Sequence, residues 1–265
     1  MNRIIYYYQT FTGLQPILSS TAPPTHIYIS SIHFGKNDTG NSYIHLNDYS
    51  PDNSKFDNVW NECQIASERE ITIMFMLGGA GGAYGELFSN FETCYQMLKN
   101  TIKKRPYIKG IDLDVEEDVS LSNIKMLINR INTDFGSDFI ITMAPLGSSL
   151  INDFPGLGNF VYKDLYNSSE GQRINWFNSQ CYFTYTPDVF TAIVDNGYPE
   201  EKIVFGMISS EFSRSLFNNA LKSIKKIKQQ YNKFGGVFVW EYCNAPPKGS
   251  KDPSEWAKEI SQVLN

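Results

Sequence analysis

The strongest constraint on the fold of this chain is a regular alternation of short apolar runs with longer amphipathic segments. Eight runs are rich in β-branched and aromatic residues, and several are bounded by Gly or Pro, which is typical of strands. We expect strands at residues 4–8, 26–33, 72–78, 110–116, 139–144, 177–182, 203–208 and 236–240. Between these runs, apolar residues spaced at i, i+3 and i+4 predict helices. We expect helices at residues 56–69, 91–103, 121–135, 187–196, 214–231 and 254–264, and loops at 9–25 and 146–175.

Strands that alternate with helices in this way predict an α/β fold with a parallel sheet. For a chain of 265 residues, the default closed form is a (β/α)8 TIM barrel. An open doubly wound sheet is the alternative, but no G-x-G-x-x-G motif follows the first strand. No linker, charge block or low-complexity tract interrupts the chain, so we expect residues 1–265 to form a single domain. Between the last two strands, a helix largely fills residues 209–235, which leaves no room for an α+β insertion.

Composition excludes several classes of protein. Hydrophobic residues make up 42% of the chain and charged residues 19%, so a sizeable core is expected and disorder is not. The net charge of −5 does not favour binding to nucleic acid or to an anionic membrane, because both are negatively charged. No apolar run reaches the roughly 18 residues of a membrane span. Aromatic residues make up 14%, and they either pack in the core or line a ligand groove.

The cysteines and the N-terminus bear on cofactors and compartment. The four cysteines are far apart and form no C-x-x-C motif, so we expect free thiols and no zinc or redox centre. We predict no metal and no cofactor. The residues after Met1 lack the basic region, apolar region and cleavage site of a secretion signal. The sequence does not decide in which cellular compartment the protein works.

Residues 110–116 read Gly-Ile-Asp-Leu-Asp-Val-Glu, which alternates apolar and acidic side chains. Neighbouring side chains of a strand face opposite sides. In a barrel, the acidic set Asp112, Asp114 and Glu116 would point inwards and rise towards the C-terminal mouth, where TIM barrels hold their active sites. Carboxyls this close cannot all ionise freely, so at least one pKa should rise, as a general acid near neutrality requires. Glu117 faces outwards and is not expected to contribute.

This segment resembles the D-G-x-D-x-D-x-E signature of glycoside hydrolase family 18, which comprises chitinases and endo-β-N-acetylglucosaminidases. Other segments resemble the family's remaining strand motifs in the same order, so the resemblance covers nearly the whole chain. These segments are residues 7–11, 77–79, 143–145, 180–182 and 235–240. Three positions depart from the pattern: Lys109 replaces the first Asp, Val115 replaces a common aromatic residue, and Phe183 stands where many members have Asn or Asp.

The resemblance implies that the N-acetyl group of the substrate attacks its own anomeric carbon. Glu116 would protonate the glycosidic oxygen, Asp114 would hold the acetamido N–H, and Tyr182 would hold the acetamido carbonyl. Asp112 would share a proton or a hydrogen bond with Asp114 and so tune it. Trp240 would form the floor beneath the reacting sugar. Further substrate contacts are assigned to Gln180, Tyr7, Met143 and Gly79. The family's unusual cis peptides would fall at residues 33–34 and 240–241.

The function implied is an endo-acting glycoside hydrolase, chitinase-like, that cleaves β-1,4 linkages of N-acetylglucosamine polymers with retention of configuration. Two alternatives stay open: an endo-β-N-acetylglucosaminidase acting on the chitobiose core of N-glycans, and a non-catalytic sugar-binding protein on the same fold. The expected partner is an oligo- or polysaccharide containing N-acetylglucosamine, with no nucleic acid and no membrane. We expect a monomer with a shallow, open groove.

Overall fold

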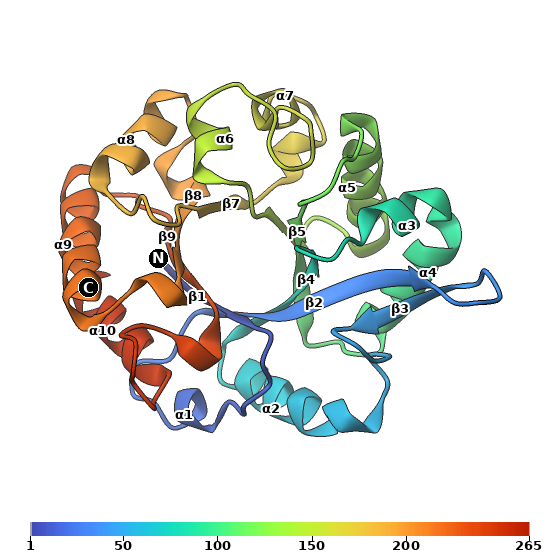
Figure 1. Cartoon of the computed structure of the whole chain (residues 1–265), viewed down its shortest axis with the longest axis horizontal. Coiled ribbons are helices and arrows are strands. Elements are labelled where there is room, and N and C mark those ends of the chain that lie inside the picture. The colour runs from blue at the N-terminus through green and yellow to red at the C-terminus, as the bar shows by residue number, and fades with distance from the viewer. Residues whose placement is uncertain (1, 265) are drawn as a thin grey trace.

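The computed structural model describes residues 2–264, which fold into a closed barrel of eight parallel strands surrounded by helices (Figure 1). The barrel strands are β1 (Arg3–Tyr8), β2 (His26–Lys36), β4 (Thr72–Gly78), β5 (Ile108–Asp114), β6 (Ile140–Met143), β7 (Trp176–Gln180), β8 (Ile203–Ile208) and β9 (Gly236–Trp240). They pair in the order β1-β9-β8-β7-β6-β5-β4-β2, and pairing of β1 with β2 closes the ring. The predicted single-domain (β/α)8 architecture is confirmed.

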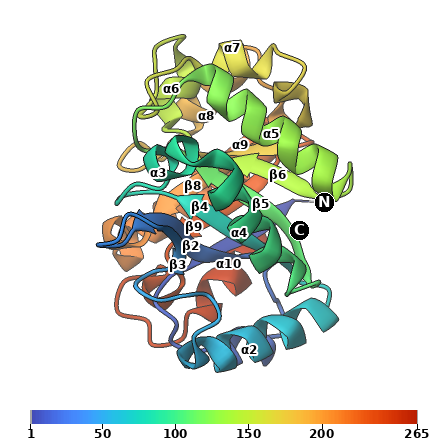
Figure 2. The same ribbon diagram turned by 90° about the vertical axis from the view of Figure 1, so that its right-hand side faces the viewer.

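The six predicted helices are all present, with ends that differ by at most one residue. They are α2 (Asp57–Glu68), α4 (Phe91–Lys103), α5 (Leu121–Phe135), α8 (Pro187–Asp195), α9 (Arg214–Gln230) and α10 (Ser254–Leu264). Seen from the side, the helices form an outer layer around the strands (Figure 2). Each turns its apolar stripe inwards, and Ser120 caps α5 by accepting a hydrogen bond from the Asn123 N–H.

Several short elements occur in segments for which helical periodicity gave no prediction, because fewer than two turns cannot show a repeat. The α-helices among them are α1 (Gln15–Leu18), α3 (Tyr84–Ser89), α6 (Gly147–Ile151) and α7 (Tyr162–Tyr166). The 3-10 helices are η1 (Ser54–Phe56), η2 (Gly171–Arg173), η3 (Glu200–Lys202), η4 (Ser209–Glu211) and η5 (Tyr242–Asn244). Between β8 and β9 the described chain contains only η4 and α9, so the predicted absence of an insertion is confirmed.

A hairpin adds one strand to the predicted set. Strand β2 continues past its predicted end to Lys36 and pairs antiparallel with β3 (Ser42–Leu46), and this hairpin projects from the barrel wall (Figure 1). The register of β2 against β4 shifts between Ile29 and Ile32, where the Ser30–Ser31 peptide is cis. The cis peptide predicted at residues 33–34 is therefore misplaced by three residues, whereas the one at Trp240–Glu241 is confirmed.

Two hydrophobic clusters lie on the two sides of the barrel wall. The larger lies between the strands and the helix layer, and the smaller fills the barrel interior. The interior cluster consists of Ile5, Tyr7, Tyr28, Met74, Met76, Trp176, Val204 and Phe238. Tyr7 is at its centre and packs with ring centroids 5.0 Å from Tyr28 and 5.2 Å from Phe238. Much of the aromatic surplus is therefore core packing.

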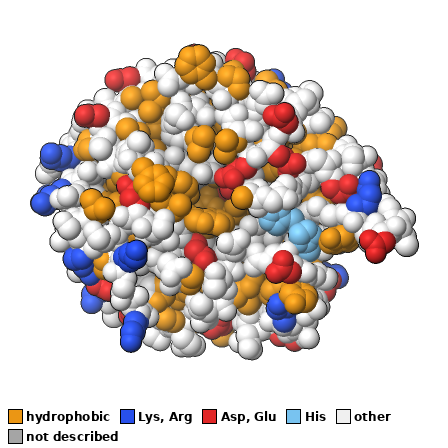
Figure 3. Space-filling model, viewed as in Figure 1, with side chains coloured by type: hydrophobic (Ala, Val, Ile, Leu, Met, Phe, Trp, Pro, Cys, Tyr) orange, Lys and Arg blue, Asp and Glu red, His pale blue; other side chains and the backbone are white. Residues whose placement is uncertain are grey.

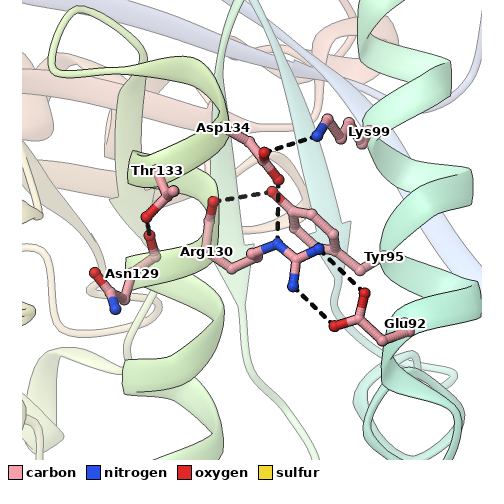
Figure 4. A network of polar contacts seen from close by, with 7 residues as sticks. All are labelled: Glu92, Tyr95, Lys99, Asn129, Arg130, Thr133 and Asp134. Carbon is pink, nitrogen blue, oxygen red and sulfur yellow. Dashed lines mark hydrogen bonds and ion pairs between the residues drawn. The ribbon is translucent and has the colours of Figure 1, made fainter.

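A polar network joins α4 to α5, the helices that precede and follow β5 (Figure 4). The Arg130 guanidinium donates to both Glu92 carboxylate oxygens at 2.8 and 3.1 Å and to Asp134 at 3.2 Å. Lys99 reaches the same Asp134 at 2.7 Å, and the Tyr95 hydroxyl donates to the Arg130 carbonyl. These contacts hold together the two helices packed behind the acidic strand.

The described part of the chain has no helix that combines the length and the apolar character needed to cross a bilayer. All four cysteines are free thiols, as predicted, and three of them are buried.

Candidate active site

The acidic side chains of β5 alternate with apolar ones as predicted. Ile111 and Leu113 are buried in the cluster beneath the helices, whereas Asp112 and Asp114 point into the barrel. Asp114 is the last residue of the strand, and Glu116 lies just beyond its end at the C-terminal mouth. The three carboxyls therefore rise from the barrel interior to its opening.

Asp112 is fully buried, and three side chains from different strands satisfy it. Its Oδ2 accepts a hydrogen bond from the Tyr7 hydroxyl at 2.7 Å. Its Oδ1 accepts from the Thr142 hydroxyl at 2.5 Å and from the Asn178 amide at 2.9 Å. Burial raises the pKa of Asp112 to about 6, although these hydrogen bonds act in the opposite direction.

Asp114 and Glu116 share one amide donor. The Gln180 Nε2 lies 3.2 Å from Asp114 Oδ1 and 3.3 Å from Glu116 Oε1, and it also donates to the Ala144 carbonyl at 2.7 Å. Burial raises the pKa of Asp114 well above its usual range, and the charges of Glu116 and Asp112 add to this effect. The strand thus carries a coupled set of carboxyls. Within residues 2–264 no hydrogen bond joins Asp112 to Asp114, so the expected direct link is replaced by electrostatic coupling.

A pocket of about 250 Å³ opens above these carboxyls. Figure 3 shows a hollow near the centre of this face, bordered by hydrophobic and acidic side chains. Its lining residues are Gln9, Ser31, Met76, Gly79, Ala80, Asp114, Glu116, Gln180, Tyr182, Ile208 and Trp240. Trp240 packs on Tyr7 with ring centroids 5.5 Å apart. The Tyr182 hydroxyl is close enough to Asp114 and Glu116 for their charges to raise its pKa further, after burial as the main cause.

Six of the predicted site residues line this pocket, and three do not. Those that line it are Asp114, Glu116, Gln180, Tyr182, Trp240 and Gly79. Asp112 and Tyr7 are not part of the lining, and the buried Tyr7 donates its hydroxyl proton to Asp112. The assignment of Met143 to the substrate site is wrong. It is fully buried against the helix layer, because Thr142 is the residue at the end of β6 that faces inwards, and Met76 supplies the pocket methionine instead.

Two residues that hold Asp112 were not predicted, although strand alternation could have indicated both. Thr142 is paired in register with Asp112 across β5 and β6, and Asn178 lies two residues before Gln180 on β7, so both share the inward parity. Polar side chains at inward positions of neighbouring strands are therefore candidates for supporting a buried carboxylate.

The glycine-rich loop after β4 brings backbone close to the acidic strand. Gly78 and Gly79 have φ values of +91° and +84°, and the Gly79 N–H donates to the Asp114 carbonyl at 2.8 Å. A Cβ on Gly79 would lie 3.2 Å from the Asp114 carboxylate. The loop is thus a tight turn that forms one wall of the pocket, and the two glycines allow its close approach.

The three departures from the family pattern lie outside the pocket lining. Lys109 is exposed, and its ammonium donates to the Pro106 carbonyl. Phe183 is 72% exposed with φ of +60°, and its N–H donates to Glu211 at 2.7 Å. None of the three substitutions removes a carboxyl from the site.

No protein-family model matches the sequence, and no curated protein matches it at a significant level. Among solved structures, a fungal endo-beta-N-acetylglucosaminidase from glycosyl hydrolase family 18 is 30% identical, with a TM-score of 0.90. The alignment covers 100% of this chain and 99% of that one. The chain belongs to glycoside hydrolase family 18.

Two further family 18 structures extend the comparison. Chitinase ChiC from Aspergillus fumigatus is 31% identical with a TM-score of 0.84, and the alignment covers 100% of both chains. A GH18 chitinase from Pseudoalteromonas aurantia is 19% identical with a TM-score of 0.77 over 99% of this chain and 100% of that one, which shows the shared fold. As a family 18 member with full-length enzyme relatives, the protein is a glycosidase.

The turn after β4 should not tolerate a side chain at Gly78. A Cβ there would lie 2.3 Å from the Asp114 carbonyl oxygen and 2.6 Å from the Tyr84 ring, in addition to its positive φ. We expect Gly78→Ala to lower the free energy of unfolding by about 2–4 kcal/mol, measured by urea denaturation. Gly136→Ala is the matched control, because Gly136 has φ of +81° and open space around it. Equal losses for the two variants would contradict the close packing.

Asp112 should make the stability of this family 18 barrel depend on pH. Because burial raises its pKa to about 6, the native state holds the proton more tightly than the unfolded chain does. Its contribution to stability is therefore complete below about pH 4 and is lost as the pH rises through about 6. Between pH 4 and 7, the free energy of unfolding should fall by roughly 2–3 kcal/mol more in wild type than in Asp112→Asn. Parallel pH curves from urea unfolding would refute this.

Proposed function

We propose that this glycosidase cleaves the β-1,4 linkage of N-acetylglucosamine-containing glycans from within the chain, by substrate-assisted catalysis with retention. The observation that carries the proposal is the arrangement in one pocket of Glu116 at the rim, Asp114 buried behind it, and Tyr182 alongside. An acid, a buried carboxyl and a phenol within one sugar-sized hollow match the three groups that such a reaction needs.

In the first step, Glu116 donates its proton to the glycosidic oxygen while the acetamido carbonyl oxygen of the same sugar attacks C1. The C1–O bond to the leaving sugar breaks, and an oxazolinium ion forms. Asp114 accepts a hydrogen bond from the acetamido N–H and stabilises the developing positive charge. Tyr182 donates its hydroxyl proton to the acetamido oxygen and keeps it oriented for attack.

In the second step, the Glu116 carboxylate takes a proton from a water molecule, which attacks C1 and opens the ring of the intermediate. Two successive inversions at C1 give net retention. The substrate supplies the nucleophile, so the protein needs only one carboxyl at the glycosidic oxygen. Trp240 offers an indole face on which the reacting sugar can stack.

For the substrate, we propose an N-acetylglucosamine polymer, that is, a chitinase-like activity. The described chain has no insertion between β8 and β9 that would deepen the pocket, which favours cleavage within a polymer, and ChiC is similar over its whole length. The second candidate is the chitobiose core of N-glycans, favoured by the TM-score of 0.90 to the fungal endo-beta-N-acetylglucosaminidase. A purely sugar-binding role has less support, because Glu116 lies in the pocket.

A paired assay tests this proposal. Purified protein is incubated separately with a fluorogenic chito-oligosaccharide and with an N-glycosylated protein, and Glu116→Gln serves as the control. Cleavage of the oligosaccharide alone supports the chitinase-like activity, and removal of the N-glycan supports the second candidate. Binding of the oligosaccharide without cleavage of either substrate would overturn the enzymatic proposal.

A further inference from the structure

The backbone around Glu116 lies outside the strand ladder. Strand β5 ends at Asp114, and within the described chain residues 115–118 make no backbone-to-backbone hydrogen bond. Among residues 2–264, the Glu116 side chain has a single hydrogen-bond partner, the Gln180 amide at 3.3 Å. Its two neighbours along the chain are therefore important for the position of this carboxyl.

Each of these neighbours is anchored. Val115 is 2% exposed and packs in the outer core. The Glu117 carboxylate accepts hydrogen bonds from three consecutive backbone N–H groups: those of Ala83, of Tyr84 at 2.6 Å and of Gly85 at 3.1 Å. Charge-assisted bonds of this kind are about twice as strong as neutral ones.

The segment to which Glu117 is bound directly follows the loop residues that line the pocket, Gly79 and Ala80. The chain from Gly79 to Gly82 leads directly into these three amides, and its first residue contacts Asp114. On its other side, the His33 ring donates from Nδ1 to the Gly82 carbonyl at 2.9 Å. The loop is thus held from two directions, and Glu117 connects it to the residue that bears the proposed acid.

We propose that Glu117 is a positioning residue, which holds the Glu116 carboxyl at the height and angle needed to protonate the leaving oxygen. This inference rests on the proposed function. The expected outward direction of Glu117 agrees with its contacts, but the expectation that it contributes nothing is revised. Removing its bonds leaves the Val115 packing and the long Gln180 bond to hold this carboxyl, and small displacements of a reacting group cost up to about 10²-fold in rate.

The test compares Glu117→Gln with wild type on two substrates. Gln keeps the shape of Glu and one acceptor oxygen. Its NH2 group is a donor that would face the backbone N–H groups of residues 83–85, so it cannot accept their hydrogen bonds. With a chito-oligosaccharide, we expect kcat to fall about 10- to 100-fold while KM changes less than about threefold. With a dinitrophenyl chitobioside, whose leaving group needs little protonation, kcat should fall less than about threefold. That second activity also shows that the variant is folded.

Glu200→Gln is the matched control, because Glu200 also accepts a backbone N–H, that of Lys233 at 2.6 Å, but at the start of β8, away from the mouth. It should leave both activities unchanged. Equal losses of Glu117→Gln on the two substrates, or no loss on either, would overturn the positioning role while the proposed function stands. If wild type cleaves neither substrate, both the proposed function and this inference fail.

Discussion

Glu116→Gln is expected to lower kcat on a chito-oligosaccharide by roughly 10²- to 10⁴-fold, the usual contribution of a general acid. The amide has the same shape as the acid and can still accept the hydrogen bond from Gln180, so the pocket should keep its form. It cannot donate an acidic proton to the leaving oxygen. Steady-state kinetics, calorimetric binding and a thermal melt would measure turnover, affinity and stability in parallel.

The affinity for a chito-oligosaccharide should stay within a few-fold of wild type, because Trp240 and Tyr182 are untouched. The melting temperature should also be unchanged. Turnover close to that of wild type would show that Glu116 is not the acid. A joint loss of binding and of stability would show instead that Glu116 has a structural role in the pocket.

Asp114→Asn is expected to lower kcat by about 10²- to 10³-fold, the range for removing one preorganised electrostatic contact from a transition state. The asparagine can still accept from Gln180, but it carries no charge to stabilise an oxazolinium ion. Its effect should differ in kind from that of Glu116→Gln. Because the acetamido group attacks whichever group departs, the loss should be equally large with a dinitrophenyl chitobioside.

The stability of Asp114→Asn separates this catalytic role from a structural one. Burial raises the pKa of Asp114, so ionising this carboxyl at neutral pH works against the folded state. Replacing it with a neutral amide should leave the melting temperature at pH 7 unchanged or higher. A lower melting temperature together with reduced kcat would indicate that the substitution damages the barrel rather than the chemistry.

The barrel itself could be predicted from sequence because its eight strands are short, apolar and separated by helices of clear period. The same alternation within residues 110–116 correctly placed Asp112 and Asp114 inside and Ile111 and Leu113 outside. Strand β3 was missed because it belongs to a local hairpin at the rim, where its mixed composition carries no barrel pattern. Short helices such as α6 depend on tertiary packing, which periodicity cannot show.

Within the site, the family motifs identified most residues that line the pocket, but they did not show which motif residues lie below it or face away from it. Tyr7 and Met143 belong to segments that resemble family motifs, yet one lies beneath the pocket and the other faces the helices. Strict use of strand parity on β6 would have replaced Met143 with Thr142. The contacts of Glu117 could not be predicted, because they join two loops whose paths are set only when the barrel closes.

The stereochemistry of the first product tests the central claim most directly. Proton NMR of a chito-oligosaccharide digest, recorded before mutarotation, reports the configuration at the new reducing end. Substrate-assisted catalysis predicts that the β-anomer forms first and that the α-anomer appears only as it equilibrates. Initial release of the α-anomer would mean direct attack of water with inversion, and it would contradict the roles assigned to Glu116, Asp114 and Tyr182.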